Sequence, residues 1–229
     1  MKLLKKNIRK HKSYVVPQGA CSDGNYIYCV YERAHKKHII VVYDKKGKQL
    51  RKSKPLKIGH GNDITYYKGN LYITHSKRDN VIHVVSAKSL KKIKDIPIKW
   101  NKSRGFNGIT VTPNGFALRT IKGNQLILTD HKFAKLKSYK FGKGYGTSQG
   151  MDYHNGKLYR AFSKLQTKGA NYIGIYNLKG ENVGHKHVKY RGELESMFWI
   201  GETLYGIIYR KKKGKGKRKK TYRSKLFKV

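Results

Sequence analysis

The sequence predicts an all-β fold, a single five-bladed β-propeller. Three observations support this: a motif that recurs five times at nearly constant spacing, a tight-turn signal inside each copy, and no segment with the periodicity of a long amphipathic helix. Repeats of about 40–45 residues that each supply four antiparallel strands are typical of propeller blades. The 229 residues are therefore expected to form one domain, residues 1–229.

Each copy opens with an amide or carboxylate residue followed by small and apolar residues. The five starts are Gln18, Asn62, Asn107, Gln149 and Glu195, which are 44, 45, 42 and 46 residues apart. Ten residues after each start the sequence has Tyr in four copies and Ala in the third. Because this register holds without a gap, the five starts mark the beginnings of five blades.

Turn residues separate the first two strands of each copy. Asn-Gly and Asp-Gly pairs favour tight hairpins, because both central residues need a positive φ. A third strand is expected at residues 38–43, 81–85, 125–129, 172–176 and 222–227. Basic fourth strands are expected in the first four copies, for example at 135–141 and 183–189.

The fifth copy ends after its third strand, and the first copy begins only at Gln18. Residues 1–16 are therefore expected to supply the fourth strand of the last blade and close the ring. Closure removes exposed sheet edges, which would otherwise invite aggregation. A short basic helix over residues 3–10 is the alternative.

The two cysteines are expected to be buried free thiols. A turn six to seven residues after the first start pairs Cys21 with Tyr28 and Ala20 with Cys29. Cys21 and Cys29 then point to opposite faces of the hairpin, so they cannot form a disulfide with each other.

The composition is strongly basic, with a formal net charge of +41 and a hydrophobic fraction of 38%. Such a charge attracts polyanions, which include nucleic acid, anionic lipid and anionic cell-wall polymers. No apolar run is long enough for a transmembrane helix. The basic N-terminus lacks the apolar region of a signal peptide, so none is visible in this chain.

The first strand of each blade lines the channel of a propeller, so the five starts should form a ring at one mouth of the channel. Their oxygens and amides could hydrogen-bond a sugar or bind Ca²⁺. The alternative is that they bond to neighbouring backbone and water and hold the blades in register.

Basic loops between second and third strands should surround the same mouth. They contribute Arg33, then Lys77 and Arg78, and in the last blade a run over residues 210–220 in which nine of eleven residues are basic. That run includes Arg210, Lys211, Lys212, Lys213 and Arg218. Like charges and glycines prevent the run from folding alone, so it is expected to be a polycationic loop that follows an anionic polymer, or else a solvated hairpin tip.

The sequence contains few of the residue patterns that enzyme active sites require. Glycoside hydrolysis needs two carboxylates, and Glu193 with Glu195 is the single pair worth testing. Strand alternation predicts that Asp63 and Asp152 point away from the ring. His38 has no further metal ligands at a recognisable sequence spacing. The protein is therefore expected to be non-enzymatic and to need no cofactor, apart from the possible Ca²⁺ at the channel mouth.

Residues 149–159 (QGMDYHNGKLY) and residues 192–202 (GELESMFWIGE) resemble stretches of the helveticin J family, large heat-labile bacteriocins of lactobacilli. The resemblance covers the last ~80 residues best, although this chain is far more basic. It implies a secreted, non-enzymatic antibacterial or surface protein of Gram-positive bacteria. The basic surface would suit attachment to teichoic acids.

The predicted function is therefore binding of anionic or glycan wall polymers by an extracellular or cell-surface monomer, with a cytoplasmic location left open. One alternative is non-specific nucleic-acid binding, in which exposed tyrosines such as Tyr145 and Tyr190 stack on bases. Another is a glycoside hydrolase or a lectin-like sugar site at the channel mouth.

Overall fold

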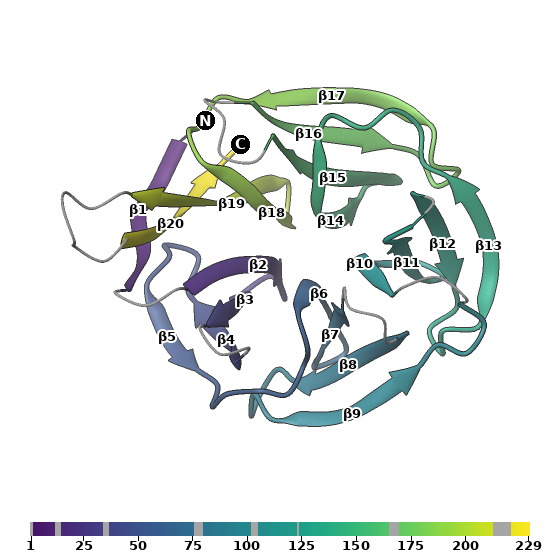
Figure 1. Ribbon diagram of the computed structural model, residues 1–229, viewed down its shortest axis with the longest axis horizontal. Coiled ribbons are helices and arrows are strands. Elements are labelled where there is room, and N and C mark those ends of the chain that lie inside the picture. The colour runs from purple at the N-terminus through teal and green to yellow at the C-terminus, as the bar shows by residue number, and fades with distance from the viewer. Residues whose placement is uncertain are drawn as a thin grey trace.

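The computed structural model describes residues 2–11, 15–33, 37–75, 80–101, 105–122, 124–164, 170–212 and 221–229. These residues form five four-stranded antiparallel sheets arranged as a five-bladed β-propeller (Figure 1). The predicted fold class is confirmed. The described part of the chain contains no helix, and hence none that could cross a membrane.

Each sheet is one blade, and its strands run from the central axis outwards. The first blade has β2 (Val15–Ser22), β3 (Ile27–Arg33), β4 (Lys37–Tyr43) and β5 (Gln49–Lys52). The second has β6 (Gly61–Tyr67), β7 (Asn70–His75), β8 (Val81–Ser86) and β9 (Lys92–Pro97). The third has β10 (Phe106–Thr112), β11 (Gly115–Thr120), β12 (Gln125–Thr129) and β13 (Lys135–Lys140).

The fourth blade has β14 (Thr147–His154), β15 (Lys157–Ser163), β16 (Asn171–Tyr176) and β17 (Asn182–Val188). The fifth has β18 (Glu193–Ile200), β19 (Thr203–Lys212), β20 (Thr221–Lys228) and β1 (Lys2–His11). The N-terminal strand β1 is therefore the outermost strand of the last blade.

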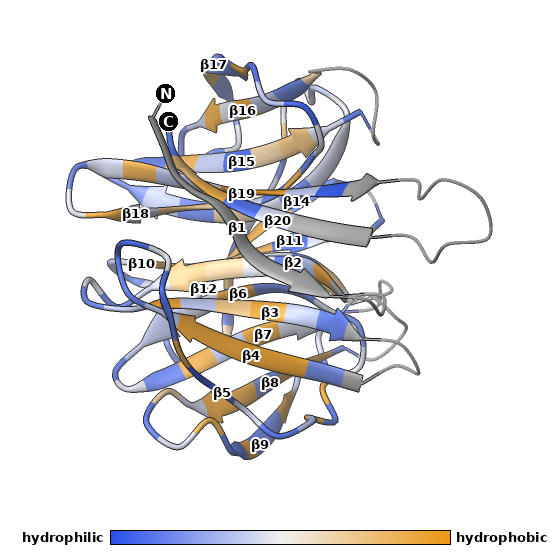
Figure 2. Cartoon of the chain, turned by 90° about the vertical axis from the view of Figure 1, so that its left-hand side faces the viewer, coloured by the Kyte–Doolittle hydropathy of each residue, from blue (hydrophilic) through white to orange (hydrophobic). Residues whose placement is uncertain are grey.

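Strand β1 closes the ring by pairing antiparallel with β20, from Lys2 opposite Lys228 to His11 opposite Tyr222 (Figure 2). The alternative of a helix over residues 3–10 is wrong. The expected boundary at residue 16 is also wrong, because Val15 and Val16 pair with β3 and belong to the first blade. The inner strand of that blade begins three residues before Gln18, so the closing strand must end earlier.

The predicted inner hairpins form as their turn residues dictate. Asn155 and Gly156 have φ values of 45° and 78°, and Lys68 and Gly69 have 44° and 79°. Positive φ at both central residues is what a two-residue hairpin turn needs, because its twist then matches that of the strands. The expectation for the cysteines is confirmed as well: both are buried and free, and Cys21 lies opposite Tyr28 in the β2–β3 ladder.

The core consists of apolar layers between neighbouring blades. Cys29 packs with Phe198 between the first and fifth blades, and Cys21 packs with Ile64 between the first and second. Similar clusters fill the other three interfaces. Because each blade buries one face on each neighbour, stability depends on a complete ring, and the inner strands are held in fixed positions around the axis.

Candidate functional site

All five predicted ring residues lie at β-bulges of the inner strands. The ladder between the first and second strand of every blade shifts register at that position. The shifts bracket Gln18, Asn62, Asn107, Gln149 and Glu195. A bulge leaves one residue out of the ladder and re-aims its side chain. The structure therefore gives the five residues a common backbone environment, one per blade.

The bulges overturn the prediction that Asp63 and Asp152 point away from the ring. Oδ2 of Asp63 accepts hydrogen bonds from the backbone N–H of Ile109, at 3.0 Å, and of Met151, at 2.9 Å, so this side chain of the second blade reaches the third and fourth. Asp152 accepts from the Thr110 hydroxyl and from the Trp199 backbone N–H of the neighbouring blades. The extra residue at each bulge resets the alternation, which places both carboxylates on the channel side.

Asp63 lies where the inner strands come closest together. A Cβ added to Gly19 would lie 2.7 Å from the Cα of Asp63, and one added to Gly150 would lie 2.7 Å from Ser196 Oγ. Ser196 in turn accepts a hydrogen bond from the Ala20 backbone N–H, at 3.0 Å. Glycine is required here because a side chain would meet the opposite strand. The channel is therefore constricted by a polar layer, and burial raises the pKa of Asp63 well above its usual value.

Carboxyl groups of the first and fifth blades lie near the channel mouth on the bulge side. Glu195 is buried, and burial, followed by the nearby Glu193 and Glu32, raises its pKa well above the usual value. Burial also raises the pKa of Glu193, against the effect of a hydrogen bond of 3.1 Å that Gln149 Nε2 donates to Glu193 Oε1. Protonated carboxyl groups are thereby favoured at this mouth.

Two ring amides carry acceptors without donors. The side-chain oxygens of Asn62 and Asn107 are buried and accept no hydrogen bond within the described residues. A buried acceptor without a donor is costly unless water or a ligand satisfies it. These are oxygens of the kind that the expected Ca²⁺ or sugar would use.

Most of the predicted basic loop residues lie outside the described part of the chain. This applies to Lys77, Arg78, Lys213 and Arg218, and to the side chains of Arg33, Lys211 and Lys212. Arg210 is half-buried near the end of β19. Whether basic side chains surround the channel mouth therefore stays a prediction for these loops.

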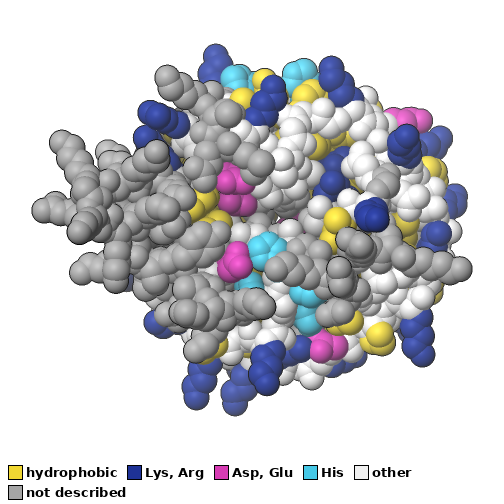
Figure 3. All heavy atoms as spheres, viewed as in Figure 1, with side chains coloured by type: hydrophobic (Ala, Val, Ile, Leu, Met, Phe, Trp, Pro, Cys, Tyr) yellow, Lys and Arg dark blue, Asp and Glu magenta, His cyan; other side chains and the backbone are white. Residues whose placement is uncertain are grey.

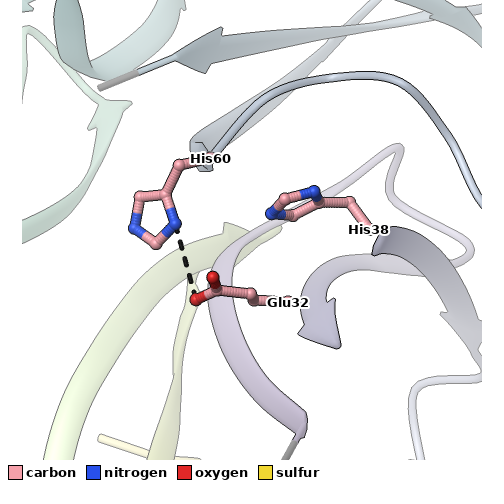
Figure 4. Close-up of side chains that lie close together, drawn as sticks. All are labelled: Glu32, His38 and His60. Carbon is pink, nitrogen blue, oxygen red and sulfur yellow. Dashed lines mark ion pairs between the residues drawn. The ribbon is translucent and has the colours of Figure 1, made fainter. Parts of the chain in front are cut away.

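A cluster of two histidines and a glutamate lies on the same face (Figure 4). The ligand atoms of Glu32, His38 and His60 all lie within 4.8 Å of one another, and His60 Nδ1 is 3.4 Å from Glu32 Oε2. Glu32 and His38 are paired across β3 and β4, whereas His60 precedes β6. Sequence spacing does not reveal this group, because strand pairing and the next blade bring its three members together from distant parts of the sequence.

Two arginines are buried without a counter-ion. Arg119 of β11 and Arg160 of β15 form no ion pair with a carboxylate among the residues that the structure describes. Burial lowers the pKa of Arg119 to about 10 and that of Arg160 to about 9. Arg160 instead lies over the ring of Phe141, 4.0 Å from its centroid, and donates to Asn124 Oδ1 at 3.0 Å. Aromatic faces and amide oxygens thus take the place of carboxylates.

Exposed lysines lie on the outer strands of the blades. They include Lys52 of β5, Lys94 of β9, Lys135 and Lys137 of β13, and Lys186 of β17. Within the described part of the chain none of these five forms an ion pair with a carboxylate. On the face shown in Figure 3, most described Lys and Arg side chains lie around the periphery, whereas acidic and histidine side chains occur both near the centre and at the edge.

The two tyrosines expected to be exposed are half-buried. Tyr145 stacks on Tyr172, with ring centroids 5.6 Å apart, and on His185, at 4.7 Å. Tyr190 packs against Phe227, at 4.7 Å. Tyr145 thus contacts rings of its own fourth blade, whereas Tyr190, between β17 and β18, contacts a ring of the fifth blade.

Comparison with known proteins supports the fold and goes no further. No protein-family model matches the sequence, and no curated protein matches it. Among solved structures, a chain of the crystal structure of the nidogen/laminin complex is similar over 80% of this chain and 67% of its own length. The TM-score is 0.57 and the sequence identity 15%. At this identity the likeness shows the propeller fold alone.

Proposed function

We propose that this protein is a non-enzymatic binding protein of a bacterial envelope, and that it attaches to anionic wall polymers through its basic surface. The observation that carries the proposal is the set of exposed lysines on the outer strands that have no carboxylate partner. Their charges are available to an external anion, since no internal ion pair has to be broken first.

The acidic residues do little to offset this charge. Glu195, Asp63 and Asp152 are buried in or beside the channel, and burial raises the pKa of each carboxyl group. A raised pKa shifts each of these groups towards its neutral form. Even with all 12 Asp and Glu residues charged, the formal net charge is +41, so the protein is strongly cationic.

A polymer of repeating phosphates fits this surface better than a small ligand does. Lysine side chains spread over several blades can each contact a different phosphate, and each contact releases a condensed counter-ion. Lysine on an edge strand also discourages pairing with other sheets. The resemblance of residues 149–159 and 192–202 to the helveticin J family supports a wall polymer such as teichoic acid and an extracellular or surface location.

The proposal is tested by sedimentation of the full chain with purified Gram-positive cell walls. Walls that retain teichoic acid should bind the protein, walls stripped of it should bind at least about 10-fold less, and binding should fall steeply with added NaCl. Equal binding to intact and stripped walls contradicts the proposal. Complete competition by DNA at equal phosphate concentration would favour the nucleic-acid alternative.

Two sets of charge variants locate the binding surface. Lys94→Gln, Lys135→Gln and Lys137→Gln in one chain should weaken binding, because they remove exposed charges without touching an ion pair. Single substitutions give a matched comparison within β9: Lys92→Gln, at a lysine already paired with Asp95 at 2.7 Å, should weaken binding less than Lys94→Gln. A second chain, in which the lysines of residues 211–220 are neutralised, measures how much that segment contributes to wall binding.

A further inference from the structure

The cluster of Glu32, His38 and His60 has a donor set suited to a transition metal. Two imidazole nitrogens and one carboxylate oxygen favour Zn²⁺ among the common divalent ions, whereas Ca²⁺ and Mg²⁺ prefer oxygen ligands throughout. Two histidines and a glutamate also leave a fourth position open for water or an anionic oxygen in a tetrahedral site.

The distances require only a small closure. Bonds of about 2.0–2.2 Å in a tetrahedral site place the ligand atoms about 3.4 Å from one another. His60 Nδ1 and Glu32 Oε2 already lie 3.4 Å apart, and no pair of ligand atoms in the cluster is more than 4.8 Å apart. The pairs that lie further apart therefore have to close by at most about 1.4 Å.

The backbone holds the three residues in place. Glu32 and His38 are cross-strand partners at adjoining ends of β3 and β4. His60 is fixed through the loop that leads into β6, where Gly59 has a φ of 53° and packs against His75. A site built on paired strands loses little conformational freedom when it binds an ion.

Solvent reaches two of the three ligands. The side chains of Glu32 and His60 are 22% and 27% exposed, whereas His38 is 2% exposed. Figure 4 shows the His60 and His38 rings and the Glu32 carboxylate directed towards a common point. An ion can therefore enter past Glu32 and His60 and meet the buried imidazole last.

The surroundings favour a cation at this point although the protein as a whole is basic. Glu32 lies close enough to Glu195 to raise the pKa of its carboxyl group, and Glu193 does the same. Three carboxyl groups thus gather near two histidines at one mouth of the channel. A bound divalent ion would favour the ionised form of the carboxylate that binds it.

We propose that Glu32, His38 and His60 form a binding site for one Zn²⁺ ion at the rim of the channel. The ion joins the first blade, through Glu32 and His38, to the segment that enters the second blade, through His60. Its open position faces the mouth that the five bulge residues surround.

The test is isothermal titration of the untagged, chelator-treated full chain with Zn²⁺. One saturable site is expected, and Co²⁺ bound in its place should give the visible absorption of a tetrahedral complex. Glu32→Gln and His60→Ala should each weaken the affinity by more than about 100-fold, because loss of an outer-shell partner alone costs 10- to 100-fold. Both side chains are partly exposed, so circular dichroism should show that these variants fold.

The control is a chain with His185→Ala and His187→Ala, which removes two histidines of β17 that lie two residues apart. It should bind Zn²⁺ like the original chain. The proposal is overturned by a wild-type titration without a saturable site, by Glu32 and His60 variants that bind normally, or by loss of binding in the β17 control. Binding of Ca²⁺ in preference to Zn²⁺ would also overturn it.

Discussion

Replacement of Asp63 should weaken the ring in a way that depends on the substitute. Its Oδ2 accepts two buried backbone N–H groups, one each from the third and fourth blades. Asp63→Asn keeps an oxygen acceptor and removes the ionisable group, whereas Asp63→Ala leaves both N–H groups without a partner. The difference between these two variants therefore isolates the hydrogen bonds that cross the channel.

The expected difference follows from the cost of orphaned donors. Each buried N–H left unsatisfied costs about 1–3 kcal/mol, so Asp63→Ala should be about 2–6 kcal/mol less stable than Asp63→Asn. Burial raises the pKa of Asp63, so loss of its ionisation is favourable near neutral pH. Asp63→Asn should consequently be at least as stable as the original chain at pH 7.

Urea unfolding at pH 7, followed by circular dichroism, measures both variants. The control is the same pair of substitutions at Asp95, which is 46% exposed and pairs with Lys92 and His83. A pair of that exposure is worth about 1 kcal/mol or less, so the two Asp95 variants should differ little. If the Asn and Ala variants of Asp63 differ in free energy of unfolding by no more than those of Asp95, the hydrogen bonds of Asp63 do not stabilise the ring as proposed.

Three further changes test other parts of the structure. Glu195→Gln should raise the free energy of unfolding by about 1 kcal/mol at pH 8 but not at pH 4. The reason is that a carboxyl group with a raised pKa costs stability as the pH rises above about 4.5. Equal increases at the two pH values would contradict a cost of burying this carboxylate. Arg160→Met should leave the melting temperature unchanged or raise it, because it removes a buried cation without a counter-ion; a loss above about 3 kcal/mol would indicate a paired charge. Gly59→Ala should be more destabilising than Gly69→Ala, since both glycines have positive φ but only a Cβ at Gly59 meets the His75 ring; equal losses in thermal melts would exclude the clash.

The blade count and the positions of the inner strands were predictable because they follow from local signals. Turn pairs such as Asn155-Gly156 fix a hairpin within a dozen residues, and five copies in one register fix the number of blades. The opposite orientation of Cys21 and Cys29 also follows, since it depends only on the register of one hairpin.

The orientation of the channel residues was not predictable by alternation. A bulge at each ring position inserts one residue into the inner strand, and a shift by one residue moves every following side chain to the other face. Asp63 therefore enters the channel instead of leaving it. The signal that identifies such a bulge is an amide or carboxylate residue at five sites, followed at four of them by Gly or Ser and at the other by Asp63.

The histidine cluster was missed for a different reason. Glu32 and His38 meet through strand pairing, but His60 arrives from the next blade, and no sequence spacing encodes that contact. The position at which the closing strand ends, His11, could not be predicted either, because residues 12–16 match the basic pattern of a fourth strand. A contact between blades decides the first feature and strand pairing within the first blade decides the second, and a single sequence displays neither.

The most direct measurement is the affinity of the full chain for purified wall teichoic acid as a function of NaCl concentration. If exposed lysines bind the polymer phosphates, the logarithm of the affinity should fall linearly with the logarithm of salt, and each lysine-to-glutamine change on the outer strands should make the slope shallower. Affinity that does not vary with salt, or a slope that those changes leave as it was, would contradict binding through uncompensated positive charge.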